Sequence, residues 1–259
     1  MGTLRVPDVV PSPDQDSERL KKAFDGFGTD EEAIIWVLGH RNASQRRTIK
    51  DRYQQLYNQS LIDHLYSELS GDFGNAVILW TQDPPERDAK LANDVLKTKK
   101  KGIKHLQVIV EIACASSPHH LMAVRQAYCS LFDCSLEEDI VSTVTPPLRK
   151  LLVGLVSSYR YDKELVDVMV AESEAATLHE AIKSKQLDHD QLVIRNSIIG
   201  LGTDEDSLTR AIVTRAEIDT MKIRGEYNNM YNSSLDTAVI DDTSGDYKNF
   251  LMTLLGARM

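Results

Sequence analysis

Apolar residues in this chain recur at the spacing of short amphipathic helices. Ile34, Ile35 and Leu38 share one face of a segment that follows T-D-E-E at 29–32, a T-x-x-E pattern typical of a capping box at a helix start. Similar signals around this segment predict further helices over 17–25, from Ser44 through Tyr57, from Ser60 and after Gly71. No stretch alternates apolar and polar residues with period two, so the pattern predicts an all-α fold with five helices per unit.

The chain contains an internal repeat. The sequence G-F-G-T-D-E at 26–31 returns as G-L-G-T-D-E at 200–205, and the same offset of 174 carries Tyr53 onto Tyr227. A fainter copy at an offset of 75 carries Tyr53 onto Tyr128 but has lost the glycine loop. From this period we expect a tail over 1–13, a first repeat over 14–83, a second, degenerate repeat over 84–160, a remnant of a third over 161–190 and a last repeat over 191–259.

Composition narrows the classes of function. The 259 residues include 39 acidic and 30 basic side chains, a net charge of -9, which argues against binding to nucleic acid and against unaided binding to anionic lipid. No uncharged apolar run approaches the roughly 18 residues of a membrane span. The N-terminus lacks the apolar core of a signal peptide, so we expect a soluble intracellular protein. Cys114, Cys129 and Cys134 form no C-x-x-C pair, and we expect buried thiols rather than a disulfide framework or a zinc site.

The glycine loop has the character of a cation site. It lacks the lysine of a P-loop, the third glycine of a dinucleotide loop and the alternating acids of an EF-hand. Glycines let backbone carbonyls approach an ion, and an acid stands forty residues beyond each loop, Glu68 after Gly28 and Asp242 after Gly202. The degenerate repeat has Thr143 there, so it lost the loop and the acid together. This pairing predicts a site for a hard cation; the alternative is a tight helix–helix turn with a capping threonine.

These motifs resemble those of the annexin family. The runs E-I-A-C at 111–114, R-Q-A-Y at 125–128, S-L-E-E-D at 135–139 and L-V-S-S-Y-R-Y at 155–161 are similar to its plant branch, and the resemblance covers nearly the whole chain. It implies two Ca2+ sites, each built from loop carbonyls and one carboxylate, with open positions left for water and a lipid phosphoryl oxygen. The implied ligands are Phe24, Gly26, Gly28 and Glu68 in the first repeat, and Ile198, Gly200, Gly202 and Asp242 in the last.

The resemblance also implies a function. We expect a calcium-dependent phospholipid-binding protein without catalytic residues, cytoplasmic and recruited peripherally to acidic phospholipid membranes when calcium rises, with a role in plant stress response. Lipid contacts are expected from Phe27 and Leu201 at the loop tips. They are also expected from lysines that the offset of 75 brings to the loop of the second repeat, Lys99, Lys100, Lys101 and Lys104. The alternative for these lysines is a loop that is only solvated.

The chain departs from the family pattern in three ways. The third repeat keeps only its first helix, over about 165–185, so roughly fifty residues are missing and the second repeat is left uncovered. Self-association through that surface is therefore expected. Ser116 stands where the other repeats have Arg41 and Arg215, which removes a basic group expected to be paired inside. Val213 stands where plant relatives often have a cysteine, which argues against a thiol pair with Cys114.

The alternatives to calcium-dependent phospholipid binding are functions that have been suggested for plant relatives. They are a heme peroxidase at His40, ion conductance across a membrane, and actin binding. A single histidine at a helix end is more often a cap or an exposed residue than a heme ligand. Trp36 and Trp80 have helix-face spacing and are expected in the core or at an interface rather than on a cofactor.

Overall fold

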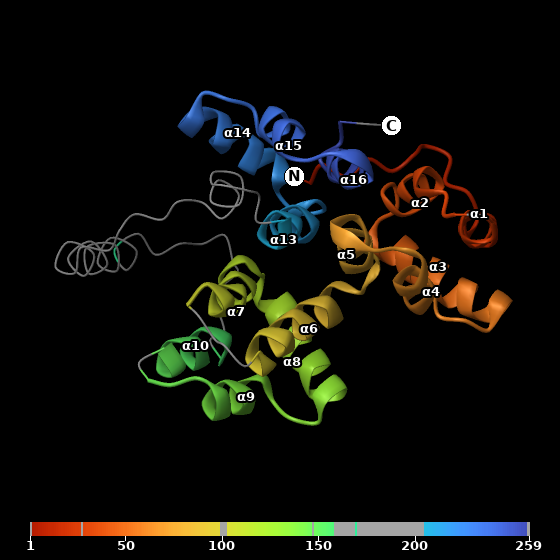
Figure 1. Ribbon diagram of the computed structural model, residues 1–259. Helices are drawn as coiled ribbons and strands as arrows, with labels where there is room; N and C mark the ends of the chain where they lie inside the picture. Colours follow the sequence, from red (N-terminus) through yellow and green to blue (C-terminus); the bar gives the residue numbers. More distant parts are fainter. Residues whose placement is uncertain are drawn as a thin grey trace. The chain divides into compact units, whose positions relative to one another are not determined.

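The computed structural model describes residues 2–26, 28–98, 103–146, 148–157, 169 and 205–257. Every regular element in these ranges is a helix, which confirms the predicted all-α fold (Figure 1). The chain divides into two compact units, residues 1–84 together with 191–259, and residues 85–190. The first unit therefore combines the segments expected as the first and last repeats.

The described helices of both units are 8 to 15 residues long. In the first unit these are α1 (Pro13–Phe24), α2 (Glu31–Leu38), α3 (Ala43–Tyr57), α4 (Leu61–Glu68), α5 (Gly71–Thr81), α13 (Glu205–Arg215), α14 (Thr220–Tyr231), α15 (Leu235–Asp242) and α16 (Gly245–Leu254). In the second they are α6 (Pro84–Lys97), α7 (Ile103–Ala115), α8 (Pro118–Phe132), α9 (Leu136–Thr143) and α10 (Leu148–Ser157).

The helix starts follow local capping, which corrects two predicted boundaries. The cap of α2 is Asp30, whose carboxylate accepts a bond of 2.9 Å from the Ala33 N–H, so the prediction of a Thr29 cap is wrong. The cap of α3 is Asn42, two residues before the predicted Ser44. Ser60 does cap α4, as expected. In both corrected cases the cap is an acidic or amide side chain that directly precedes the first residue of the helix.

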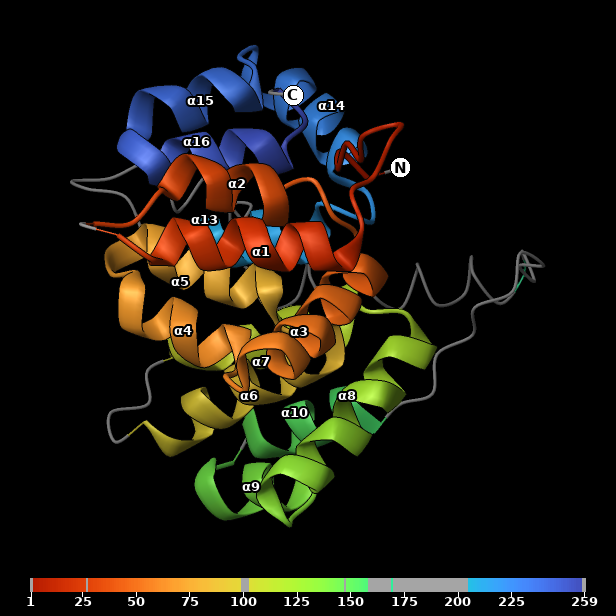
Figure 2. The same cartoon turned by 90° about the vertical axis from the view of Figure 1, so that its right-hand side faces the viewer.

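The core of the first unit joins its two halves. Helix α5 packs against α13 and α16, and α2 lies beside α16 in both views (Figures 1 and 2). The rings of Phe73 and Phe250 meet edge to face across this junction, with centroids 6.2 Å apart. Trp80 is fully buried and donates its indole N–H to the Leu38 carbonyl at 2.7 Å, so its expected place in the core is confirmed.

The chain start also ties the two halves of this unit together. The Thr3 N–H donates to the Ala216 carbonyl at 2.7 Å, and the Thr3 hydroxyl donates to the Leu254 carbonyl at 2.6 Å. The carboxylate of Glu217 accepts from the Ala43 N–H at 2.8 Å, at the first turn of α3. These bonds anchor the first residues and α3 to the last repeat.

The second unit has its own core, formed by apolar faces of α6 to α10. Its most buried members include Leu96, Ile109, Tyr128, Ile140 and Leu152. Cys114 and Cys129 are exposed and Cys134 is half-buried at the edge of this core, so the prediction of buried thiols is wrong. Cys114 and Cys129 each follow a fully buried residue on a helix, and a step of about 100° per residue turns them away from the core.

Candidate metal centre

The glycine loop connects α1 to α2 and is closed by backbone bonds. The Asp25 N–H donates to the Lys21 carbonyl at 3.0 Å, and the Asp30 N–H donates to the Ala23 carbonyl at 2.9 Å. Gly28 has φ +94°, a conformation that residues with a side chain rarely adopt. A Cβ at Gly28 would meet nothing within 4 Å, so the loop needs glycine here for its backbone angle and not for space.

The fold brings Glu68 to this loop. Glu68 is the last residue of α4, and the Thr29 hydroxyl donates to its Oε2 at 3.4 Å, although the two residues are 39 positions apart in sequence. The Glu68 side chain is 31% exposed, so it remains accessible to an ion from solvent. The predicted meeting of loop and acid is therefore present, and Thr29 contributes a bond to the acid instead of a helix cap.

A buried pair stands behind Glu68. The Tyr53 hydroxyl lies 2.6 Å from Nδ1 of His64, and Nε2 of the same ring lies 4.0 Å from Oε1 of Glu68. The ring of Phe24 packs on the imidazole with centroids 4.4 Å apart. Burial, followed by the charge of Lys21, lowers the pKa of His64, and burial raises the pKa of Tyr53. Both groups are therefore neutral near pH 7.

The donor set at this loop suits a calcium ion. Carboxylate and backbone carbonyl oxygens are the ligands that Ca2+ takes in proteins. In the described part of the chain no three His, Cys, Asp or Glu side chains lie close enough to share an ion, so an ion here would depend on backbone oxygens. The residues that could supply them, Phe24, Gly26 and Gly28, belong to the loop that Glu68 approaches.

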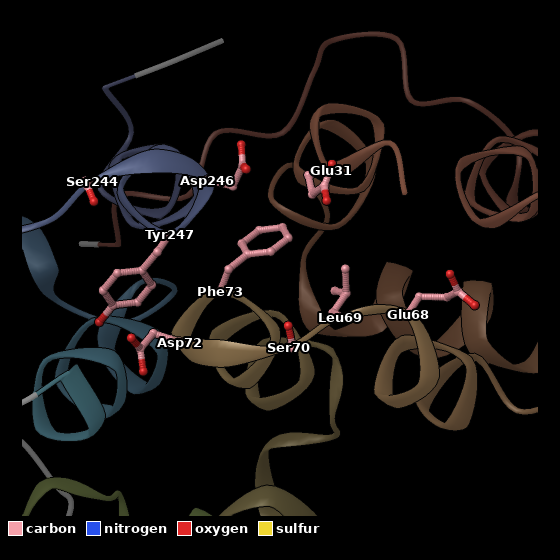
Figure 3. A pocket seen from close by; sticks show the side chains of 9 residues that line it. All are labelled: Glu31, Glu68, Leu69, Ser70, Asp72, Phe73, Ser244, Asp246 and Tyr247. Atoms are coloured by element: carbon pink, nitrogen blue, oxygen red, sulfur yellow. The ribbon is translucent and has the colours of Figure 1, made fainter. Parts of the chain in front are cut away.

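A pocket of about 340 Å³ opens beside Glu68, between the two halves of the first unit. Its lining takes equivalent positions from both halves, Asp72 and Phe73 from α5 and Asp246 and Tyr247 from α16 (Figure 3). The lining carries four carboxylates and no lysine or arginine; its members are Glu31, Glu68, Leu69, Ser70, Asp72, Phe73, Ser244, Asp246 and Tyr247. This surface is therefore acidic and would repel anionic lipid without a cation.

The second loop that is expected to bind calcium lies mostly outside the described residues. Asp242 ends α15 as Glu68 ends α4. The other ligands expected there, Ile198, Gly200 and Gly202, lie outside the described residues, as does Leu201. Phe27 and the lysines at 99–101 also lie outside them, and only the backbone of Lys104 is described, in the first turn of α7.

The degenerate repeat fills the equivalent place differently. Tyr128, the counterpart of Tyr53, donates to Oδ2 of Asp139 at 2.5 Å, and Nζ of Lys97 lies 3.1 Å from the same oxygen. Asp139 stands at the position of His64, and Thr143 at the position of Glu68. A lysine therefore neutralises the carboxylate of this repeat, where no ligand acid is present.

Two further groups bear on the predictions. His40 is 3% exposed, and its Nδ1 lies 3.0 Å from the Trp36 carbonyl.

Asp88 is 4% exposed and accepts from Arg87 at 2.8 Å, with Nε2 of His120 2.7 Å away. His120 thus pairs with a buried acid in the repeat where Ser116 replaced an arginine. This partner was missed from the sequence because the base moved to another position.

Tyr53 and His64 were also missed. A signal for them existed, because His64 precedes Glu68 by four residues on one helix and therefore shares its face. Nothing in sequence spacing indicated that Tyr53, on α3, would reach the far side of that imidazole.

Comparisons with known proteins agree with this architecture. The annexin family model matches residues 15–80, 88–155 and 191–254. Annexin D3 of Arabidopsis thaliana is 51% identical over 321 aligned positions, covering 100% of both chains. The solved structure of annexin III has a TM-score of 0.86 at 27% identity, covering 98% of this chain and 97% of its own. The structure described as calcium-bound annexin (Sm)1 has a TM-score of 0.82 at 25% identity, covering 99% and 93%. The chain belongs to the annexin family and is similar to its plant members.

Proposed function

We propose that this chain binds acidic phospholipid membranes when calcium is present, through the loop at 26–29 with Glu68 and through the equivalent loop of the last repeat with Asp242. The observation that carries the proposal is the bond between Thr29 and Glu68, because it joins the glycine loop to the acid that the sequence pairs with it. The description of annexin (Sm)1 as calcium-bound supports a calcium role for a relative of this fold.

The ion accounts for how an acidic protein holds an acidic membrane. A chain with a net charge of -9 and an acidic pocket beside Glu68 is repelled by anionic headgroups. Calcium takes about six to eight oxygens, more than three loop carbonyls and one carboxylate provide, so lipid phosphoryl oxygens and water fill the remaining positions. The proposal assigns lipid contact to Phe27 and Leu201, which stand between the two glycines of each motif in the sequence.

The proposed association is peripheral. No helix in the described ranges is long and apolar enough to cross a membrane. We place the protein in the cytoplasm at low calcium and on the inner face of membranes when calcium rises. The proposal assigns no catalytic residue, and among the described groups nothing favours a heme at His40, which is buried and bonded to the Trp36 carbonyl.

Cosedimentation with phosphatidylserine vesicles tests the proposal. The parent chain should pellet with vesicles much more strongly in calcium than in chelator. Glu68→Gln with Asp242→Asn should remove most of the calcium dependence, because each substitution deletes the only carboxylate assigned to its loop. A matched control, Asp63→Asn with Asp241→Asn, also removes two negative charges, but from other, exposed positions on the same two helices. It should leave binding unchanged. Undiminished calcium-dependent pelleting of the first double variant would overturn the assignment of ligands.

A further inference from the structure

The Tyr53 and His64 pair lies directly behind the carboxylate assigned to calcium. Tyr53 is fully buried and His64 is 8% exposed, so both side chains are largely shielded from solvent. The phenol oxygen is 2.6 Å from Nδ1, and Nε2 on the opposite side of the ring is 4.0 Å from Oε1 of Glu68. The imidazole therefore stands between a hydroxyl and the ligand acid, with Phe24 packed on its face.

This arrangement selects one tautomer of the imidazole. A neutral imidazole has one N–H and one lone pair, and the bond made by one nitrogen determines the role of the other. When the Tyr53 hydroxyl donates to Nδ1, the ring proton resides on Nε2, the nitrogen that faces Glu68. The ring then offers a donor and no lone pair to the carboxylate.

The three described tyrosines at equivalent positions show that this use of the imidazole is specific to the first repeat. In the degenerate repeat Tyr128 donates to Asp139, and no ligand acid follows. In the last repeat the position of His64 is taken by Ala238, and the ligand acid is the shorter Asp242. Glutamate has one more rotatable bond than aspartate and loses more side-chain freedom when it is ordered. The imidazole therefore accompanies the longer ligand, which has more freedom to lose.

We propose that His64 is a positioning residue for Glu68: Tyr53 fixes its tautomer, and its Nε2–H, 4.0 Å from Oε1, attracts that oxygen electrostatically while Thr29 binds the other one. The inference rests on the proposed calcium function and deepens it, because it gives the first repeat a positioning group that the sequence of the last repeat lacks, where Ala238 takes the place of His64. Groups that orient a metal ligand commonly change metal affinity by about 10- to 100-fold when they are removed.

The test measures the calcium concentration that gives half-maximal pelleting with phosphatidylserine vesicles, with Asp242 intact and again in Asp242→Asn. Tyr53→Phe keeps the ring and its packing and removes only the hydroxyl, and His64→Ala removes the imidazole. Each should raise the half-maximal calcium concentration about tenfold in Asp242→Asn, and less when Asp242 is intact. Tyr227→Phe, the same change in the repeat without the imidazole, is the matched control and should cause no shift.

A merely structural role is separated from positioning by two readouts. In Glu68→Gln, adding Tyr53→Phe or His64→Ala should cause no further shift, whereas a general loss of structure would act in that background too. Nitrogen NMR of the imidazole should detect the Nε2–H form in the parent and a mixture of tautomers in Tyr53→Phe. Unchanged half-maximal calcium in both single variants, or equal shifts with and without Glu68, would overturn the inference. A parent chain that ignores calcium would overturn the proposed function itself.

Discussion

Asp16 and Arg41 form a two-pronged ion pair inside the first unit. Nε of Arg41 lies 2.7 Å from Oδ2 of Asp16 and its Nη2 lies 2.8 Å from Oδ1, and both side chains are almost completely buried. The pair joins α1 to the start of α3, so it fixes the helix that leads into the glycine loop. Because both charged groups are shielded from water, each is stabilised mainly by the other.

Removing one member of this pair should destabilise the protein strongly. Asp16→Asn leaves the Arg41 guanidinium buried without a counter-charge, and we expect a loss of about 3 to 5 kcal/mol in the free energy of unfolding. The control is Asp14→Asn, which breaks the partly exposed pair with Arg52 and should cost much less, because water and salt screen that pair. Urea unfolding followed by circular dichroism measures both, and equal losses would show that burial is not the deciding factor.

The Asp88 pair should make the second unit sensitive to acid. Burial alone raises the pKa of the Asp88 carboxyl, but the charge of Arg87 and the bonds from His120 and Arg87 outweigh it, so the pKa lies below its ordinary value. Because the folded pKa is depressed, the stabilisation is complete above the unfolded value of about 3.9 and is lost as pH falls through the folded pKa. Asp88→Asn should therefore be less stable than the parent at pH 7 and pH 5, with the difference shrinking below about pH 4. A difference independent of pH would contradict this origin.

Sequence reasoning reached the helical class and the pairing of the glycine loop with Glu68 because both depend on spacing along the chain. It could not reach contacts made by side chains on separate helices. The Thr29 cap illustrates this: T-x-x-E is a valid local signal, but Asp30 competes for the same N–H groups and leaves the Thr29 hydroxyl for Glu68. Similarly, the sequence shows that Ser116 stands in place of an arginine. That His120 supplies the missing base becomes evident only when α8 is seen beside α6.

The basic loop of the second repeat should contribute binding that does not need calcium. Lys97, the last residue of α6, forms an ion pair with Asp139, and this pair anchors the end of the helix that precedes the loop. Lysines near anionic lipid are each worth about 1 kcal/mol, and salt screens exposed charges beyond about 10 Å at 0.1 M. Replacing Lys99, Lys100, Lys101 and Lys104 with Gln should therefore reduce vesicle binding in chelator, most clearly at low salt.

An equal loss of charge elsewhere provides the control for that prediction. Four lysines on other helices, Lys22, Lys90, Lys150 and Lys222, can be replaced with Gln without touching the loop. If both quadruple variants lose the same amount of binding, only the net charge matters. If the parent does not bind in chelator at all, the loop is only solvated.

The shortened third repeat should cost the second unit its stability. The alignment with Annexin D3 runs over 321 positions although this chain has 259 residues, and the family model matches nothing between 156 and 190. We therefore expect the second repeat to lack part of the cover that a complete third repeat would provide. Val108, Ile109 and Leu152 are buried within the unit, but Leu151 is 54% exposed. An exposed apolar side chain beside a missing neighbour favours self-association.

We therefore expect the chain to self-associate in sedimentation velocity and to show an early thermal transition from the second unit, while the first unit keeps its calcium response. Inserting about fifty residues of a typical third repeat after Val193 should give a monomer that unfolds later, because a repeat is stabilised chiefly by its neighbours. Leu151→Lys should reduce association of the short chain without changing its calcium dependence, since Leu151 lies outside the unit that carries Glu68. A short chain that is monomeric, with one sharp transition at the temperature of the longer chain, would mean that the second repeat is closed by its own residues.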